Sequence, residues 1–238
     1  MQKSARKRLL MAVSILVVVF GLAVGLGVGL TQKHSHNSSA TATATPTPTS
    51  SPSNSTSSAK VWQPKNGTTW NIQLLKPLTS PSKGDFDVWD IDLFDNTQET
   101  ISSLKNQSAK VICYFSAGSS EDWRPDYSSF ASSDLGNGLD GWPGENWLNL
   151  SSPNVRKTME KRLDLAHSKG CDGVDPDNVD GYDNDNGLSL TQQDSIEYMQ
   201  FLATAAHQRG MAIGLKNAGA LISSLLDAVQ WSVNEQCV

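Results

Sequence analysis

The residues best suited to chemistry lie between Gly170 and Tyr182, in the stretch GCDGVDPDNVDGY. A short apolar run there ends in three carboxylates, Asp175, Asp177 and Asp180, with a proline among them. In a parallel barrel, the catalytic side chains follow the carboxyl ends of the strands. Carboxylates crowded at such a place repel one another and lose hydration, so at least one should have a displaced pKa, which acid–base and nucleophilic chemistry exploits. We therefore expect the active site at the end of this strand.

Two other interpretations of this stretch stay open. Asp, Asn, Pro and Gly are also ordinary turn residues, so the stretch can be a plain loop. The other interpretation is a calcium loop, because Asp183 and Asp185 follow closely. The EF-hand spacing requires glycine at the sixth position, which is Leu188 when counted from Asp183 and Asp180 when counted from Asp175. Because neither register fits, we expect no metal.

Strands and helices alternate between Trp70 and Glu235, which is the pattern of a parallel sheet. The predicted strands end in polar or acidic residues, so their chemistry gathers at one end. We expect an α/β fold, a (β/α)8 TIM barrel that stops after the sixth strand, with a six-unit open sheet as the alternative. The predicted strands are Trp70–Leu74, Phe86–Leu93, Lys110–Ser116, the run that follows Gly170, Met211–Asn217 and Val229–Glu235, and the predicted helices are Gln98–Asn106, Asn154–Lys169, Thr191–His207 and Leu221–Leu226.

Two stretches between the third strand and the next helix have no clear periodicity. Ala117–Pro125 and Gly141–Trp147 are rich in polar residues, Gly and Pro, so we expect loops there. Their tryptophans, Trp123, Trp142 and Trp147, are either core anchors or exposed platforms that stack on sugar rings.

The N-terminal part of the chain predicts a membrane anchor and a stalk. Residues 9–30 are 22 consecutive uncharged positions, mostly apolar, which is enough to cross a bilayer as a helix. Basic residues and no acid precede them, so the positive-inside rule keeps residues 1–8 in the cytosol. A cleaved signal peptide is the alternative. Residues 31–59 are mostly Ser, Thr, Ala, Pro and Asn, so we expect an extended, O-glycosylated stalk. We thus predict a single-pass type II membrane protein with an extracellular domain at residues 60–238.

Charge and cysteine content restrict the partners of that domain. Residues 60–238 carry 14 basic and 24 acidic residues, so nucleic acid and anionic lipid are poor partners and a cationic ligand is a reasonable one. Cys113, Cys171 and Cys237 make an odd count in an oxidising compartment, so we expect one of them to lack its partner in this chain. The sequence contains no phosphate-binding glycine loop after the first strand, no paired-cysteine zinc spacing and no HExxH, so we expect no cofactor.

With these motifs in order, the domain resembles the glycoside hydrolase family 114 enzymes, the endo-α-1,4-polygalactosaminidases of fungi and bacteria. The resemblance runs from about Val61 to the end of the chain. Its order and spacing, more than any single motif, carry the likeness. The motifs are WDIDLFD at Trp89–Asp95, CYFSAGSSEDWRPD at Cys113–Asp126, GWPGENWLNL at Gly141–Leu150, and then CDGVDPDNVDGY, GLKNA and NEQC.

The resemblance implies a barrel with a nucleophile after the fourth strand and an acid/base residue after the sixth. It implies Asp177 as the nucleophile, the fifth position after Asp172 in a DG-x-x-x-D frame, and Glu235 as the acid/base. Asp175 lies outside that frame and is the alternative nucleophile or a neighbour that tunes the charge. Other strand-end residues are expected to contact the sugar, with a structural hydrogen bond as the alternative role of each: Asp92, Tyr114, Asp180, Lys216 and Asn217.

Two carboxylates suit the cleavage of a glycosidic bond, in which one protonates the leaving oxygen and the other meets the oxocarbenium-like carbon. The family comparison favours retention of configuration, for which the carboxyl groups lie about 5 to 5.5 Å apart, against about 6.5 to 9.5 Å for inversion. An acidic rim suits de-acetylated galactosamine, which is cationic near neutral pH. A neutral α-galactan and another amino sugar polymer stay open.

We therefore expect a membrane-anchored, extracellular, endo-acting hydrolase of α-1,4-linked galactosamine-containing polysaccharide. The alternative from a different class is a catalytically inactive cell-surface carbohydrate-binding protein.

Overall fold

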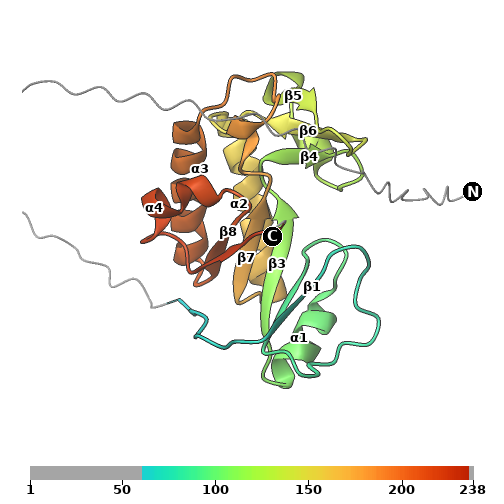
Figure 1. The fold of residues 1–238 in the computed structure, drawn as a ribbon. Coiled ribbons are helices and arrows are strands. Elements are labelled where there is room, and N and C mark those ends of the chain that lie inside the picture. The colour runs from blue at the N-terminus through green and yellow to red at the C-terminus, as the bar shows by residue number, and fades with distance from the viewer. Residues whose placement is uncertain (1–60, 236–238) are drawn as a thin grey trace, which may run out of the picture. The chain divides into compact units, whose positions relative to one another are not determined.

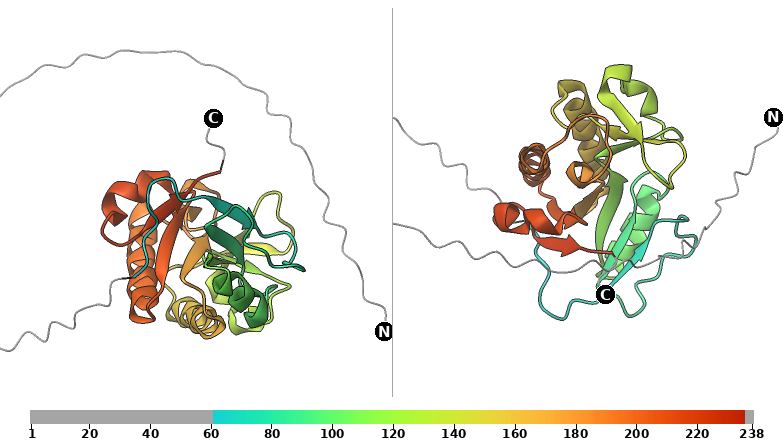
Figure 2. Two further views of the ribbon diagram at one scale, coloured as in Figure 1. Left: turned by 90° about the horizontal axis from the view of Figure 1, so that it is seen from below. Right: turned by 45° about the horizontal axis from the view of Figure 1, so that its top comes forward.

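The computed structural model describes residues 61–235 of the 238-residue chain, and Figure 1 shows their fold. Six strands form one parallel sheet in the order β1-β2-β3-β7-β8-β9. The sheet is curled into a half-barrel, which confirms the prediction of a barrel-type fold with six strands in this part of the chain (Figure 2). The strands are β1 (Trp70–Gln73), β2 (Val88–Asp92), β3 (Lys110–Ser116), β7 (Gly173–Asp177), β8 (Ala212–Lys216) and β9 (Trp231–Val233).

The α-helices of the described residues connect these strands, and α1, α2 and α3 lie on the outer side of the curled sheet (Figure 2). Three of them begin at a hydroxyl cap, because Thr97, Ser152 and Thr191 accept hydrogen bonds from backbone N–H groups of the first turn. Gly170 ends α2 with a φ of 86°, the left-handed conformation that glycine adopts readily. The helices are α1 (Gln98–Asn106), α2 (Pro153–Lys169), α3 (Gln192–Gln208) and α4 (Ile222–Leu225).

The two faces of the curled sheet differ in polarity, because alternate residues of a strand point to opposite faces. On the outer face of β3, Val111, Cys113 and Phe115 are fully buried in the apolar core. The inner face carries the polar side chains that alternate with such residues. They are Asp90 on β2, Tyr114 on β3, Asp175 and Asp177 on β7, and Lys216 on β8.

A second, antiparallel sheet follows β3, with the order β4-β6-β5, and it corrects the expectation of plain loops. Its strands are β4 (Ser119–Glu121), β5 (Leu135–Gly138) and β6 (Glu145–Leu148). Trp147 on β6 is buried, whereas Trp123 and Trp142 are 44% and 64% exposed. The three tryptophans therefore divide between a core anchor and two exposed rings.

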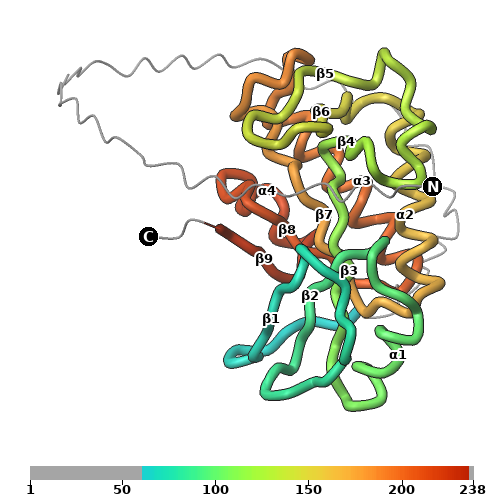
Figure 3. The backbone as a smooth tube through the Cα atoms, turned by 90° about the vertical axis from the view of Figure 1, so that its right-hand side faces the viewer, coloured from blue at the N-terminus to red at the C-terminus, as the bar shows by residue number. Residues whose placement is uncertain are grey.

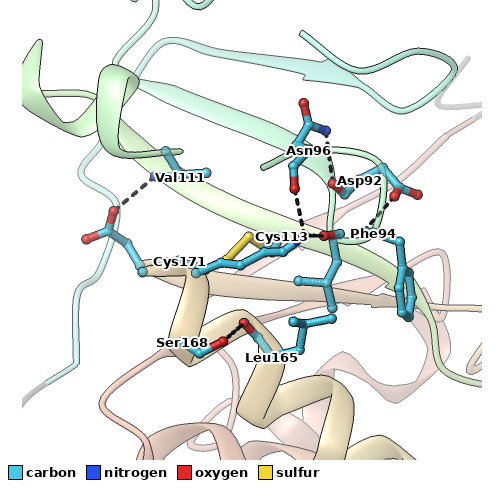
Figure 4. The surroundings of a disulfide bond; sticks show 12 residues. Asp92, Phe94, Asn96, Val111, Cys113, Leu165, Ser168 and Cys171 are labelled. Atoms are coloured by element: carbon cyan, nitrogen blue, oxygen red, sulfur yellow. Dashed lines mark hydrogen bonds between the residues drawn. A yellow bond between two sulfur atoms is a disulfide. The ribbon is translucent and has the colours of Figure 1, made fainter. Parts of the chain in front are cut away.

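A disulfide joins Cys113 on β3 to Cys171, which lies two residues before the start of β7. Both residues are buried, and Figure 4 shows the bond beside Asp92, the last residue of β2, and Asn96, which follows that strand. The bond therefore links two central strands of the half-barrel. The sequence left this pairing open, and the third cysteine, Cys237, lies outside the described residues.

The indole of Trp231 on β9 fills space on the inner face above two glycines of neighbouring strands. A Cβ atom added to Gly214 would lie 2.2 Å from the indole Nε1, and one added to Gly173 would lie 2.7 Å from its Cη2. Glycine is therefore required at both positions by the ring that covers them. The edges of the sheet, β1 and β9, can be followed in Figure 3.

The predicted cytosolic tail, membrane anchor and stalk, at residues 1–8, 9–30 and 31–59, lie outside the described residues. Between residues 61 and 235, no helix is long and apolar enough to cross a membrane.

Candidate active site

The carboxyl ends of the inner strands bring the predicted catalytic residues together. Asp177 is the last residue of β7, and Lys216 is the last residue of β8. Glu235 follows β9, two residues after Val233, which pairs with Lys216 in the sheet. The structure therefore places Asp177, Lys216 and Glu235 at one end of three neighbouring strands.

Three hydrogen bonds fix the carboxylate of Asp177. The hydroxyl of Tyr114 donates to Oδ2 at 2.8 Å, and Nζ of Lys216 donates to the same oxygen at 2.9 Å. The backbone N–H of Asn178 donates to Oδ1 at 2.8 Å. Hydrogen bonds from charged donors such as Lys216 are strong, so these contacts hold the Asp177 side chain in one orientation.

Lys216 also contacts the second predicted catalytic residue, because its Nζ lies 3.2 Å from Oε1 of Glu235. Burial alone would lower the pKa of Lys216, but Asp177 and Glu235 together raise it, so the side chain stays cationic. Burial acts to raise the pKa of Glu235, but the charge of Lys216 and hydrogen bonds from Asn217 and Lys216 outweigh burial and lower it. One ammonium group thus lies between the two carboxylates.

Two asparagines in the left-handed conformation shape the strand ends. Asn178 follows β7 with a φ of 62°, and Asn217 follows β8 with a φ of 57°. Asparagine adopts this region more readily than most residues. The Asn217 side chain accepts a hydrogen bond from the backbone N–H of Glu235 at 2.9 Å and donates to its Oε2 at 3.1 Å. Asn217 therefore orients the carboxylate of Glu235.

Close backbone packing holds Asn178 in place. A Cβ atom added to Gly118 would lie 1.7 Å from the carbonyl oxygen of Asn178. The N–H groups of Ala117 and Gly118 also donate to the carbonyl oxygen of Asp177, at 2.8 and 2.9 Å. The segment after β3 therefore supports Asp177 and Asn178, the first of which is the predicted nucleophile.

Beneath Asp177, Asp90 and Asp175 form a fully buried carboxyl pair. Among the described residues, none of their four carboxyl oxygens has a hydrogen-bond partner by ordinary geometry. Burial, and then the neighbouring charge of Asp175, raise the pKa of Asp90 well above its usual value. Burial, and then Asp177, raise the pKa of Asp175 to about 7. The pair therefore retains a proton under mildly acidic conditions.

The carboxylate of Asp92 is engaged by an arginine. Arg124 donates from Nη1 and Nη2 to the two oxygens of Asp92 and from Nε to Glu121 at 2.7 Å. All three side chains are buried. Asp92 and Asp175 thus lie inside the protein rather than at an exposed rim, and their predicted contact with sugar stays a prediction.

The remaining predicted contacts, Tyr114 and Asp180, lie near Asp177. Burial, and then the charge of Asp177, raise the pKa of Tyr114 well above 10, so its hydroxyl remains a donor. Burial raises the pKa of Asp180, with a smaller contribution from Asp177. Both residues are partly exposed.

The candidate site also includes two carboxylates that the sequence did not single out, Glu121 on β4 and Glu145 on β6. They are opposite each other in the antiparallel sheet and both are buried. Burial raises the pKa of Glu121, and burial followed by the charge of Glu121 raises the pKa of Glu145 to about 7. Asp90 was missed as well, although its spacing of two from Asp92 already placed both on one face of the strand.

The described residues 61–235 contain no group of three or more His, Cys, Asp or Glu side chains that could hold a metal ion. Asp185, part of the calcium interpretation, accepts a hydrogen bond from the Asn137 side chain at 3.0 Å.

Two carboxylates at the carboxyl ends of parallel strands, here Asp177 on β7 and Glu235 after β9, are the arrangement of barrel glycoside hydrolases. Comparison with known families agrees with this class. The chain belongs to glycoside-hydrolase family GH114, whose model matches residues 51–238. The chain is therefore a glycoside hydrolase, as the resemblance implied.

Solved structures support the same assignment. The chain is similar to Ega3 of Aspergillus fumigatus, crystallised in complex with galactosamine, with 62% identity and a TM-score of 0.73 over 75% of this chain and 71% of that one. The fold is also similar to the glycoside hydrolase domain of PelA from Pseudomonas aeruginosa, with 15% identity and a TM-score of 0.57 over 71% of this chain and 67% of that one. None of the curated proteins compared with the chain matches it.

Proposed function

We propose that this chain hydrolyses α-1,4-linked galactosamine-containing polysaccharide at internal bonds, with Asp177 as nucleophile and Glu235 as acid/base. The observation that carries the proposal is the shared contact of both carboxylates with Lys216. The similarity to a protein crystallised with galactosamine supports an amino sugar as the substrate unit.

The spacing of the carboxylates supports a retaining mechanism. Because Nζ of Lys216 lies 2.9 Å from Oδ2 of Asp177 and 3.2 Å from Oε1 of Glu235, these two oxygens are within about 6.1 Å of each other. Retaining enzymes separate the two groups by about 5 to 5.5 Å, which leaves no room for a water molecule between nucleophile and sugar.

In this mechanism, Asp177 attacks the anomeric carbon while the bond to the leaving oxygen breaks and Glu235 gives that oxygen a proton. Glu235 then accepts a proton from water, which attacks the anomeric carbon and releases Asp177. Tyr114 and Lys216 orient Asp177 before the attack. Lys216 also keeps the free enzyme's two carboxylates from repelling each other.

The test is hydrolysis of a partly de-acetylated α-1,4-galactosamine polymer by the purified full-length chain, followed by the appearance of reducing ends. We expect Asp177→Asn to abolish hydrolysis and Glu235→Gln to lower kcat by about 10²- to 10⁴-fold. Proton NMR of the first product should show the α-anomer. A wild type that binds the polymer without cleaving it would favour the carbohydrate-binding alternative.

We also propose that residues 9–30 anchor the enzyme in a membrane as a type II protein, with the hydrolase domain outside the cell. The support is the sequence alone: an uncharged apolar run preceded by basic residues. Extraction of cell membranes with alkaline carbonate should leave the full chain in the pellet, and external protease should digest the domain of intact protoplasts. Release of the full chain into the supernatant would contradict the anchor.

A further inference from the structure

Glu145 is a buried carboxylate without a cation beside it. The side chain is 7% exposed, and its Oε2 accepts a hydrogen bond from the hydroxyl of Ser119 at 3.0 Å. Among residues 61–235, no Lys, Arg or His nitrogen lies within 4.0 Å of it, and its Oε1 has no hydrogen-bond partner. Burial of a carboxylate without an ion-pair partner is costly, so the presence of Glu145 at this position needs an explanation.

The neighbours of Glu145 add further negative charge around its carboxylate. Glu121 lies opposite on β4, and the charge of Asp177 also acts on Glu145. Arg124 attracts it only from a distance, because its donors are directed to Glu121 and Asp92. Burial first, and then the charge of Glu121, bring the pKa of Glu145 to about 7. The Ser119 hydrogen bond opposes this rise, Asp177 adds to it by a smaller amount, and Arg124 opposes it least.

A short chain of hydrogen bonds connects Glu145 with the proposed nucleophile. The Ser119 hydroxyl, which donates to Glu145, accepts a hydrogen bond from Nδ2 of Asn178 at 2.8 Å. The backbone N–H of the same Asn178 donates to Oδ1 of Asp177 at 2.8 Å. Glu145 therefore lies beside the reacting end of β7, and its position is fixed by the residues that fix Asp177.

We propose that Glu145 is a specificity-determining residue that binds the ammonium group of a galactosamine unit held at Asp177. The inference rests on the proposed function and adds the group that selects the amino sugar. An ammonium group carries three N–H donors and a positive charge, which match the unpaired oxygen of Glu145 and the surplus negative charge around it. N-acetylation removes this charge, so the same contact discriminates against acetylated units.

The experiment compares Glu145→Gln with wild type, as full-length chains, on a de-acetylated and on a fully acetylated galactosamine polymer. Asp140→Asn is the matched control, because Asp140 is an exposed carboxylate in the loop before β6. We expect Glu145→Gln to lower kcat/KM on the de-acetylated polymer by about 10- to 100-fold, the size of a lost charged hydrogen bond. On the acetylated polymer we expect a change of less than about threefold, and Asp140→Asn should behave as wild type on both.

Folding does not confound the comparison. The protonated form of Glu145 is neutral and has nearly the shape of glutamine, so Glu145→Gln removes a buried charge without creating a cavity. We expect its melting temperature to equal or exceed that of wild type at pH 8. A variant that melts well below wild type would be replaced by Glu145→Asp, which keeps the charge and should recover part of the preference for the de-acetylated polymer.

The pH dependence gives a second readout. Because binding of a cation favours the ionised carboxylate, KM for the de-acetylated polymer should fall as pH rises through about 7, and Glu145→Gln should lose this dependence. Equal losses on both polymers, or no loss on either, would overturn the role of Glu145 while leaving the proposed hydrolase intact. A wild type that cleaves neither polymer would instead overturn the proposed function.

Discussion

Removal of the disulfide between Cys113 and Cys171 should destabilise the hydrolase domain without changing its inner face. The two residues are 58 positions apart, and a cross-link that closes a loop of this length lowers the entropy of the unfolded chain. The chain-entropy relation gives about 4 kcal/mol for this loop at 25 °C. In a domain of this size, 1 kcal/mol corresponds to about 2–4 °C, so the melting temperature should fall by about 8–16 °C.

The assay is thermal unfolding of the full chain in a Cys237→Ser background, which prevents exchange with the third cysteine. The melting temperature is first compared between the oxidised protein and the same protein reduced chemically. Because both cysteine side chains remain, the difference measures the effect of the cross-link alone. The double variant Cys113→Ala/Cys171→Ala should melt lower still, since truncation of two buried side chains adds a packing loss. Reductant should not change the melting temperature of the double variant, and this measurement is the control for other effects of the reductant.

Two results would refute this reasoning. A reduced protein that melts within about 3 °C of the oxidised one would show that the cross-link does not constrain the unfolded chain as the loop length requires. A non-reduced peptide map of the wild-type chain in which Cys237 is joined to Cys113 or Cys171 would refute the pairing itself. Hydrolysis at 25 °C should change little, because the disulfide lies on the outer face of the sheet.

Three further predictions follow from the contacts of the site. Gly118→Ala should lower kcat by about 100-fold, because the added methyl group displaces Asn178 and with it the proposed nucleophile, Asp177, and a kcat within twofold of wild type would contradict this. Stability should fall as pH rises from about 4 to about 7, because the folded state keeps protons on Asp90 and Asp175 that the unfolded chain releases, and Asp90→Asn should reduce the slope of the urea midpoint against pH. Activity should be greatest below pH 7, because Glu235, the proposed acid/base, has a lowered pKa and is less often protonated at higher pH, and a pH–rate profile that rises above pH 8 would contradict this.

The sequence predicts the large sheet and its helices closely, because each element has a clear period and clear end signals. The helix predicted at Asn154–Lys169 is observed at Pro153–Lys169, and the strand predicted at Met211–Asn217 is observed at Ala212–Lys216. The strands β4, β5 and β6 could not be found in the same way. They are three or four residues long and mostly polar, so neither alternation nor hydrophobicity distinguishes them from loops.

The candidate site shows a similar division. Strand ends are visible in the sequence, so Asp177 and Glu235 could be placed at one end of the sheet. The ion pair between Asp92 and Arg124 could not be predicted, because it joins positions 32 residues apart and depends on the folded loop. The burial of Glu145 could not be predicted either, because the sequence around it shows no strand or helix periodicity. Its burial results from the pairing of β6 with β4.

Trp231 restricts how related sequences can diverge. Its indole occupies the space that side chains at Gly173 and Gly214 would fill, so a larger residue at either position requires a smaller one at 231. In turn, loss of the ring alone leaves a gap above two glycines that cannot fill it. We expect these three positions to change together in evolution, and single replacements among them to be rare in functional homologues.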